Sequence, residues 1–252
     1  MQLQDKVVVI TGAARGLGRA YAEAMAAEGA SVYACDVNSC DETVAAITAA
    51  GGSAASGSVD ISSMESCQAM ADGAVAAFGR IDVLVNNAAL YGGLKGGRFE
   101  SLDEDQWDAV MNVNIKGVWQ TCKACVNPLR KAGGGSIINI ASLAAVFGMP
   151  YGLDYVASKA AVIGMTRGMA RELGGDSIRV NAVAPSAVMT ESTSEFFGEK
   201  MDKAKVVIAK GQVLQRNLET HDLTGTIIYL ASDNSAFVTG QTHMVDGGSW
   251  FL

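Results

Sequence analysis

Tyr155 and Lys159 are the two side chains in this sequence whose types and spacing best suit a chemical role. On a helix, a spacing of four residues puts them on one face about one turn apart, so the lysine ammonium can lie near the phenol oxygen. A free tyrosine has a pKa of about 10, and a neighbouring cation favours the phenolate. Such a phenol can take a proton from an alcohol while a hydride leaves the carbon. Ser142, which ends an expected strand, can hydrogen-bond the same substrate oxygen.

Hydride chemistry needs a dinucleotide, and the stretch Val7–Gly18 has the pattern of a binding site for one. An apolar strand runs into a turn with Gly12, Gly16 and Gly18, and the turn opens a helix. Glycines allow a tight bend and a close approach of backbone N–H groups, and the start of a helix attracts phosphate. A plain strand-to-helix turn has the same pattern, so the rest of the chain has to decide between the two interpretations.

Asp36 selects the dinucleotide that we expect. It follows the second expected strand, about 20 residues beyond the glycine turn, where a carboxylate can accept both hydroxyls of an adenosine ribose and repel a 2′-phosphate. A solvated loop aspartate is the alternative. Arg15 argues the other way, because a cation in the glycine turn can bind a 2′-phosphate. Asp36 would stand directly at the ribose, so the sequence favours NAD over NADP.

Strands and helices alternate along the whole chain. We expect strands from residue 7 and over 30–35, 53–59, 81–85, 136–140, 178–183 and 242–245, helices over 17–28, 41–50, 62–78, 102–131, 153–173 and 222–231, a mobile loop over 90–102 and a helical flap over 191–217. This alternation predicts an α/β fold with a doubly wound parallel sheet of Rossmann type, in three α/β/α layers, as a single domain over residues 1–252.

Polar or small residues follow the ends of successive strands, at the edge where such sheets bind ligands. They are Gly12, Asp36, Asp60, Asn87, Ser142 and Pro185. The amides of Asn86 and Asn87 can clamp the backbone and a ligand together, although an asparagine pair also makes ordinary turns. Asn114 stands on an apolar helix face, so it is either a satisfied core amide or a functional one.

Composition excludes several classes of function. The 252 residues include 19 basic and 26 acidic side chains, and the net charge of −7 argues against a nucleic acid partner. The apolar runs are too short to span a bilayer, and the first residues lack the pattern of a signal peptide. We therefore expect a cytoplasmic protein without a membrane partner.

The cysteines and histidines do not predict a metal site. Cys122 and Cys125 form a C-x-x-C inside an expected helix, where we interpret them as packed core residues. His221 and His243 are the only histidines, and neither has ligand-type neighbours at a useful spacing.

The motifs taken together resemble one family. TGAARGLG at 11–18, NNAA at 86–89 and YVASK at 155–159, with Asp60, Asn114 and Ser142, are similar to the short-chain dehydrogenase/reductase family, in its single-domain branch of about this length. The resemblance covers essentially the whole chain. It implies NAD(P)-dependent oxidation of an alcohol or reduction of a ketone, and an oligomer, with a homotetramer favoured.

The same resemblance implies roles for individual residues. Tyr155 would be the acid/base, Lys159 would bind the nicotinamide ribose and lower the tyrosine pKa, Ser142 would position the substrate, and Asn114 would hold a water for a proton relay. Asp60 would lie near the adenine, Asn87 on the adenosine side, and Val188 and Thr190 near the nicotinamide amide. The full set of expected cofactor contacts is Gly12, Arg15, Gly16, Leu17, Gly18, Asp36, Asp60, Ile61, Asn87, Tyr155, Lys159, Val188 and Thr190.

The chain departs from the family pattern at two positions. Ala89 replaces the glycine that usually ends the NNAG motif, which adds one methyl group near the cofactor. Ser186 replaces the glycine that usually follows the proline of the PG turn, which puts the local backbone and the nicotinamide pose in doubt.

The expected substrate is a secondary alcohol or its ketone, with an aryl or cyclic group. Candidates for an apolar pocket wall are Tyr91, Leu143, Met149, Phe196 and Phe197, which can equally be packing residues. Two other functions compete with this one. An NAD-dependent epimerase or dehydratase usually has a larger C-terminal substrate region and another glycine spacing. A dinucleotide-binding regulator without catalysis would have lost a catalytic group.

Overall fold

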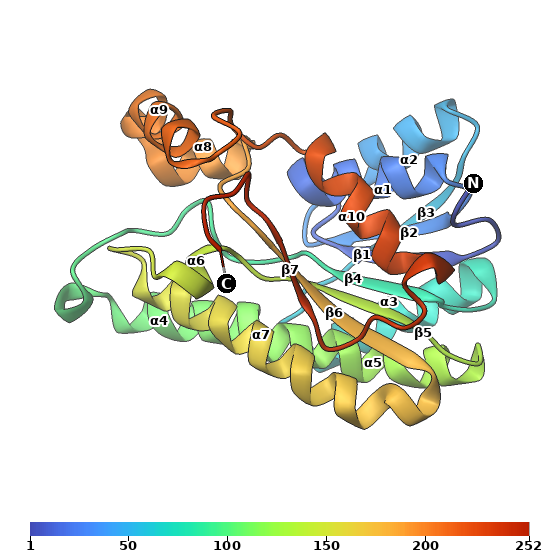
Figure 1. The fold of residues 1–252 in the computed structure, drawn as a ribbon. Helices are drawn as coiled ribbons and strands as arrows, with labels where there is room; N and C mark the ends of the chain where they lie inside the picture. The colour runs from blue at the N-terminus through green and yellow to red at the C-terminus, as the bar shows by residue number, and fades with distance from the viewer. Residues whose placement is uncertain (252) are drawn as a thin grey trace.

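The computed structural model describes residues 1–251, and its centre is one sheet of seven parallel strands (Figure 1). The strands lie in the order β3-β2-β1-β4-β5-β6-β7, so the order reverses between β1 and β4. This is the doubly wound, Rossmann-type sheet that the sequence predicts. The strands are β1 (Val7–Thr11), β2 (Ser31–Asp36), β3 (Ser53–Ser58), β4 (Val83–Asn86), β5 (Gly135–Ile140), β6 (Ile178–Pro185) and β7 (Thr242–Val245).

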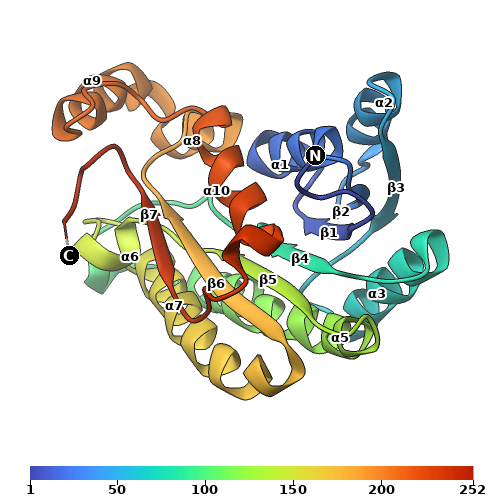
Figure 2. The same cartoon turned by 45° about the vertical axis from the view of Figure 1, so that its right-hand side comes forward.

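Helices cover both faces of the sheet (Figure 2). One face carries α1 (Gly16–Ala27), α2 (Asp41–Ala49) and α10 (His221–Ala231), and the other carries α3 (Met64–Phe78), α5 (Val118–Lys131) and α7 (Leu153–Leu173). Alternate side chains of a strand point to opposite faces of the sheet. Val8 and Ile10 pack on the side of α1, and Val9 packs on the side of α3 and α5. Both faces of β1 are therefore buried, as its unbroken apolar sequence predicts.

The prediction of one continuous helix over 102–131 is wrong in the middle of that range. The structure has α4 (Glu104–Met111), then a π-helical segment, Asn112–Gly117, and then α5. The apolar pattern does not reveal such a wide turn, because contacts outside the helix hold it. Asn114 hydrogen-bonds the backbone of Leu90, and a Cβ on Gly117 would lie 2.8 Å from side-chain atoms of Ile61.

Two smaller differences concern the end of the sheet near the expected site. β6 continues to Pro185 rather than ending at Val183, because Pro185 pairs with Val245 of β7. A short helix, α6 (Ala144–Phe147), directly follows the strand-end residues Ser142 and Leu143 and has no signal in the sequence.

The expected flap is a pair of short helices that stand beyond the carboxyl ends of the strands (Figure 1). They are α8 (Glu191–Phe197) and α9 (Met201–Gly211), joined by a 3₁₀ turn, Gly198–Lys200. No residue of α9 is buried. No helix within residues 1–251 is both long enough and apolar enough to cross a bilayer.

Candidate active site

A large cavity lies along the edge where the strands end. Its volume is about 1310 Å³, above the range of roughly 300–1,000 Å³ that is usual for drug-sized ligands. Most of the residues predicted to bind a cofactor or act in catalysis line it: Gly12, Arg15, Gly16, Leu17, Asp36, Asp60, Ile61, Asn87, Ser142, Tyr155, Lys159, Val188 and Thr190. Gly18 and Asn114 do not. The structure thus brings together residues from six strand ends and from α7.

The glycine turn gives a ligand access to the backbone. Gly12 and Gly16 have φ angles of 68° and 59°, which favour glycine. Asn87 holds the turn in place, because its amide donates hydrogen bonds of 3.0 Å to the carbonyls of Thr11 and Gly12. Gly18 has a packing role: a side chain there would overlap the carbonyl of Gly12. The turn leaves the start of α1 open to the cavity, which fits a pyrophosphate.

Two carboxylates lie on the same side of the cavity. Asp36, at the end of β2, accepts hydrogen bonds from the backbone N–H of Ala14 at 3.2 Å and of Asn38 at 3.0 Å, so it is fixed against the glycine turn. Asp60 accepts a hydrogen bond from the Ser62 hydroxyl at 2.7 Å, which lowers the pKa of that carboxyl. The position of Asp36 suits the hydroxyls of an adenosine ribose.

Arg15 has an arrangement that the sequence did not predict. Its guanidinium pairs with Glu195 of α8 through two hydrogen bonds of 2.7 Å and 3.1 Å, and with Glu191 at 3.3 Å. These glutamates are far from the glycine turn in sequence, so no local pattern could have indicated the contact. The cation of the turn is therefore already neutralised by the flap.

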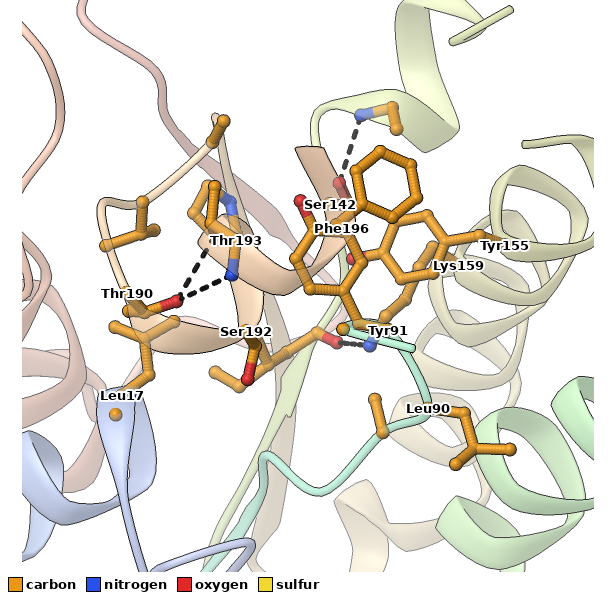
Figure 3. A pocket seen from close by; sticks show the side chains of 18 of the residues that line it. Leu17, Leu90, Tyr91, Ser142, Tyr155, Lys159, Thr190, Ser192, Thr193 and Phe196 are labelled. Carbon is orange, nitrogen blue, oxygen red and sulfur yellow. Dashed lines mark hydrogen bonds between the residues drawn. The ribbon is translucent and has the colours of Figure 1, made fainter. Parts of the chain in front are cut away.

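Tyr155 and Lys159 lie one turn apart on α7 and face Ser142 at the end of β5 (Figure 3). The Lys159 ammonium is buried and donates a 2.7 Å hydrogen bond to the carbonyl of Ile140. It lies 5.8 Å from the centroid of the Tyr155 ring. Burial lowers the pKa of Lys159 to about 8.

The expected lowering of the Tyr155 pKa by Lys159 is not found. Burial raises the pKa of this phenol above its usual value, the neighbouring Tyr91 adds to the rise, and the hydrogen bond with Ser142 opposes it. The ammonium has turned to the Ile140 carbonyl, which explains why it does not offset the cost of burying a phenolate. The site as it stands holds Tyr155 as a neutral acid.

Asn114 is fully buried in the π-helical segment and has all its partners within the protein. Its amide donates to the carbonyl of Leu90 at 3.1 Å and to the Ser158 hydroxyl at 3.2 Å, and its oxygen accepts from the N–H of Leu90 at 2.7 Å. The sequence left open whether Asn114 is a core amide with all its hydrogen bonds made or a functional residue. The hydrogen bonds within the protein agree with the core amide. It ties the loop after β4 to α7, and the water-holding role stays a prediction.

Aromatic side chains form the wall beside Tyr155. The ring of Tyr91 lies 5.0 Å from that of Tyr155 and is stacked on Phe196 of α8, with 4.8 Å between centroids and 17° between planes (Figure 3). Phe197 meets Phe196 edge-on at 5.2 Å. These three residues, with Leu143 and Met149, line the cavity as predicted.

Comparison with known proteins places this site in a family. Residues 12–249 match the family profile described as Enoyl-(Acyl carrier protein) reductase. The chain belongs to the short-chain dehydrogenase/reductase family. An uncharacterized oxidoreductase of Mycobacterium tuberculosis is 46% identical over 247 residues, which are 97% of each chain. The 3-oxoacyl-[acyl-carrier-protein] reductase of Thermotoga maritima is 38% identical over 98% of this chain and 99% of that one.

A solved structure agrees with the fold. Carveol dehydrogenase from Mycobacterium avium in complex with NAD has a TM-score of 0.93 and 30% identity, and the match covers 98% of both chains. The resemblance stated from the motifs is therefore confirmed, and this short-chain dehydrogenase/reductase belongs to a group whose named members are dehydrogenases and reductases.

Ser186, one of the two departures of this short-chain dehydrogenase/reductase from the family pattern, fits the turn after β6 without a positive φ angle. Its N–H donates to the carbonyl of Val245 at 3.1 Å, and its hydroxyl accepts a 3.1 Å hydrogen bond from the buried amide of Gln212. Gln212 directly follows α9, so the serine ties the two ends of the flap together.

Sequence reasoning missed part of the cavity wall. Ser249 and Trp250, close to the C-terminus, line the cavity with Val207 and Ile208 of α9. Asp246 shapes this tail by accepting hydrogen bonds from the N–H of Trp250 at 2.9 Å and of Gly248 at 3.0 Å. The D-G-G sequence indicates a turn, but it does not indicate where the turn leads.

Proposed function

We propose that this chain is an NAD-dependent oxidoreductase that interconverts a secondary alcohol and its ketone, acting on an aryl or cyclic substrate. One observation carries the proposal: a single cavity joins the glycine turn and Asp36 to Tyr155, Ser142 and Lys159. A dinucleotide bound along it would have its phosphates at the turn and its reactive ring near the tyrosine.

The choice of NAD rests on two charges. Asp36 lines the cavity beside the glycine turn, where a 2′-phosphate would meet a carboxylate. Arg15, the cation that could offset this repulsion, is paired with Glu195 and Glu191. The likeness to a dehydrogenase solved with NAD supports the same choice. When bound, NAD supplies the hydride acceptor, and NADH supplies the donor.

The protein's part in the chemistry is to hold the substrate oxygen and move one proton. In ketone reduction, the Tyr155 hydroxyl donates its proton to the carbonyl oxygen, and the Ser142 hydroxyl hydrogen-bonds the same oxygen. The raised pKa of Tyr155 keeps the phenol protonated at neutral pH, as this direction requires. In alcohol oxidation, the deprotonated form, the Tyr155 phenolate, takes the proton from the alcohol oxygen. Lys159 is held by Ile140 on the side of the cavity where it can also bind a ribose hydroxyl.

The aromatic wall supports the substrate class. Tyr91 and Phe196 present flat apolar surfaces next to Tyr155, and Leu143 and Met149 complete that side of the cavity. A ring on the substrate can pack against these surfaces, with offset stacking as the favoured geometry.

The other functions gain no support from the site. A regulator without catalysis has no need of Ser142, Tyr155 and Lys159 on one cavity. The substrate region of an epimerase or dehydratase would be larger than the flap seen here, which spans α8 and α9 only.

The test is an oxidation assay with NAD and secondary alcohols of three kinds: aryl, alicyclic and acyclic. A 3-oxoacyl thioester, offered with NADH, covers the chemistry of the T. maritima relative. We expect NADH to form with at least one ring-bearing alcohol, and Tyr155→Phe to lower the rate by about 10²–10⁴-fold, the usual contribution of general acid–base catalysis. Tyr229→Phe, on α10 outside the cavity, is the matched control and should keep full activity. An active Tyr155→Phe enzyme would exclude the proposed acid/base.

A further inference from the structure

The ion pairs of Arg15 connect the flap to the glycine turn. Arg15 is the residue before α1 and lines the cavity, and α8 is separated from it by more than half of the chain. The guanidinium meets both carboxylate oxygens of Glu195, which is the fork-to-fork geometry that gives arginine pairs their specificity. Glu191, one helical turn earlier, contacts the same nitrogen at 3.3 Å.

Few cations are available to a ligand in this cavity. Within residues 1–251, the cationic side chains that line it are Arg15, Lys159 and Lys200. Lys159 is bound to Ile140 beside Tyr155, and Lys200 belongs to the flap. Of these three cationic side chains, only Arg15 lies in the glycine turn, which is the part of the cavity that Asp36 contacts. A 2′-phosphate at the ribose, which carries up to two negative charges, would therefore depend on Arg15 for compensation.

We propose that Glu191 and Glu195 are positioning residues, which set the selectivity between NAD and NADP by neutralising Arg15. This inference rests on the proposed function. The two carboxylates turn the cation of the glycine turn into a cluster with a net charge of −1. A dinucleotide without the 2′-phosphate is unaffected, because it places no additional charge there. A dinucleotide with the phosphate meets Asp36 and an arginine that already makes three hydrogen bonds to the two glutamates.

The test measures cofactor binding without substrate, by the fluorescence of NADH and NADPH. Glu191→Gln/Glu195→Gln keeps the side-chain sizes and removes both charges. We expect its Kd for NADPH to fall about tenfold while its Kd for NADH stays within about twofold of the wild type, since Arg15 gains a free guanidinium and Asp36 still repels the phosphate.

Two further variants separate this mechanism from a general change of charge. Glu199→Gln/Asp202→Asn removes the same charge from the flap at residues that make no ion pair within residues 1–251, and it should bind NADPH as the wild type does. In an Arg15→Ala background, the two glutamine substitutions should bring no gain in NADPH affinity, because the residue through which they act is absent.

The outcomes distinguish this inference from the proposed function. If the wild type binds NADH and the double glutamine variant shows no gain for NADPH, the inference fails and the proposed function stands. A gain that persists in the Arg15→Ala background, or that the control variant reproduces, also overturns the inference. A wild type that binds neither cofactor, or that prefers NADPH, overturns both.

Discussion

At the residue scale, the hydroxyl of Tyr155 is subject to opposing influences. Burial and the nearby Tyr91 raise its pKa, and the hydrogen bond with Ser142 lowers it. The Lys159 ammonium, which was expected to lower the pKa as well, is directed to a backbone carbonyl. The protein alone therefore favours the protonated phenol, and the two directions of the reaction should respond differently to pH.

We predict that kcat/KM for alcohol oxidation rises with pH from about pH 6 to about pH 9, by up to tenfold per unit, because the phenolate fraction rises tenfold per unit below the pKa. Below about pH 8, where Lys159 keeps its charge, kcat/KM for ketone reduction should stay level, since Tyr155 remains protonated. Initial rates in both directions check this.

Ser142→Ala is the control for this pH dependence. It removes the hydrogen bond that lowers the Tyr155 pKa, so it should lower the oxidation rate at every pH of the range while the slope against pH stays the same. An oxidation rate that is flat or falls over the range would rule out Tyr155 as the titrating base.

How far the sequence could predict individual residues depends on how far apart their partners lie. The spacing of Tyr155 and Lys159 predicted a shared helix face, because a helix has a fixed period. The direction of the Lys159 ammonium depends on Ile140, which lies on a strand. The partner of Arg15, Glu195, lies 180 residues further along the chain. Contacts of this kind follow from the packing of elements and leave no local pattern.

At the level of the elements, α8 makes two different kinds of contact along the cavity. Glu195 and Phe196 are adjacent, yet Glu195 pairs with the glycine turn and Phe196 stacks on Tyr91. The helix thus contacts both the proposed cofactor side and the proposed substrate side of the cavity. Its position fixes the aromatic wall next to Tyr155.

We predict that Phe196→Ala raises KM for ring-bearing alcohols about tenfold and changes KM for small acyclic alcohols by less than about twofold. The substitution removes the binding energy of one apolar ring surface. The ground state and the transition state share this binding energy, so kcat should change little. Steady-state kinetics on both kinds of alcohol measure it. Phe99→Ala, an exposed phenylalanine outside the cavity, is the control. Equal effects on both kinds of alcohol would show that Phe196 does not select rings.

The element boundaries show where sequence patterns are sufficient. The bounds of α7 and β7 agree with the predictions because apolar periodicity and turn residues mark both ends. The π-helical segment Asn112–Gly117 was missed, because an extra residue in one turn barely alters the apolar pattern. Asn114 was noticed as a polar residue on an apolar face, and its partner Leu90 could not be identified without the fold.

At the scale of the whole molecule, alternation of strands and helices predicted a parallel sheet, but it did not determine the strand order. The observed reversal between β1 and β4 places Gly12 and Asn87 side by side at the switch point, which is where doubly wound sheets bind ligands. The alternation of strands and helices thus predicted which residues reach the binding edge of the sheet. The order of the strands determines which of these residues are neighbours.

Two large aromatic side chains are exposed on separate elements of the fold. Trp119 of α5 has about half of its surface exposed, at 47%, and Phe237, in the segment between α10 and the edge strand β7, is fully exposed. Figure 1 shows α5 below the sheet and α10 above it. Large aromatic side chains are enriched at interfaces between protein chains.

We propose that the chain forms a homotetramer through two separate interfaces, one at Trp119 and one at Phe237. Two isologous interfaces on different faces build a tetramer with dihedral symmetry, and loss of one leaves a dimer. Light scattering should give a mass about four times the chain mass of 26.1 kDa for the wild type. Trp119→Glu and Phe237→Glu should each give about half of that mass, and the double variant a monomer.

Phe99→Glu introduces the same charge at another exposed aromatic residue, in the 3₁₀ turn before α4, and should leave the tetramer intact. A monomeric wild type would exclude the proposal. A tetramer that survives both single substitutions would place its interfaces elsewhere. If only Phe237→Glu lowers the mass, the face formed by α10 and β7 carries an interface and Trp119 does not, so the tetramer would need a second surface other than α5.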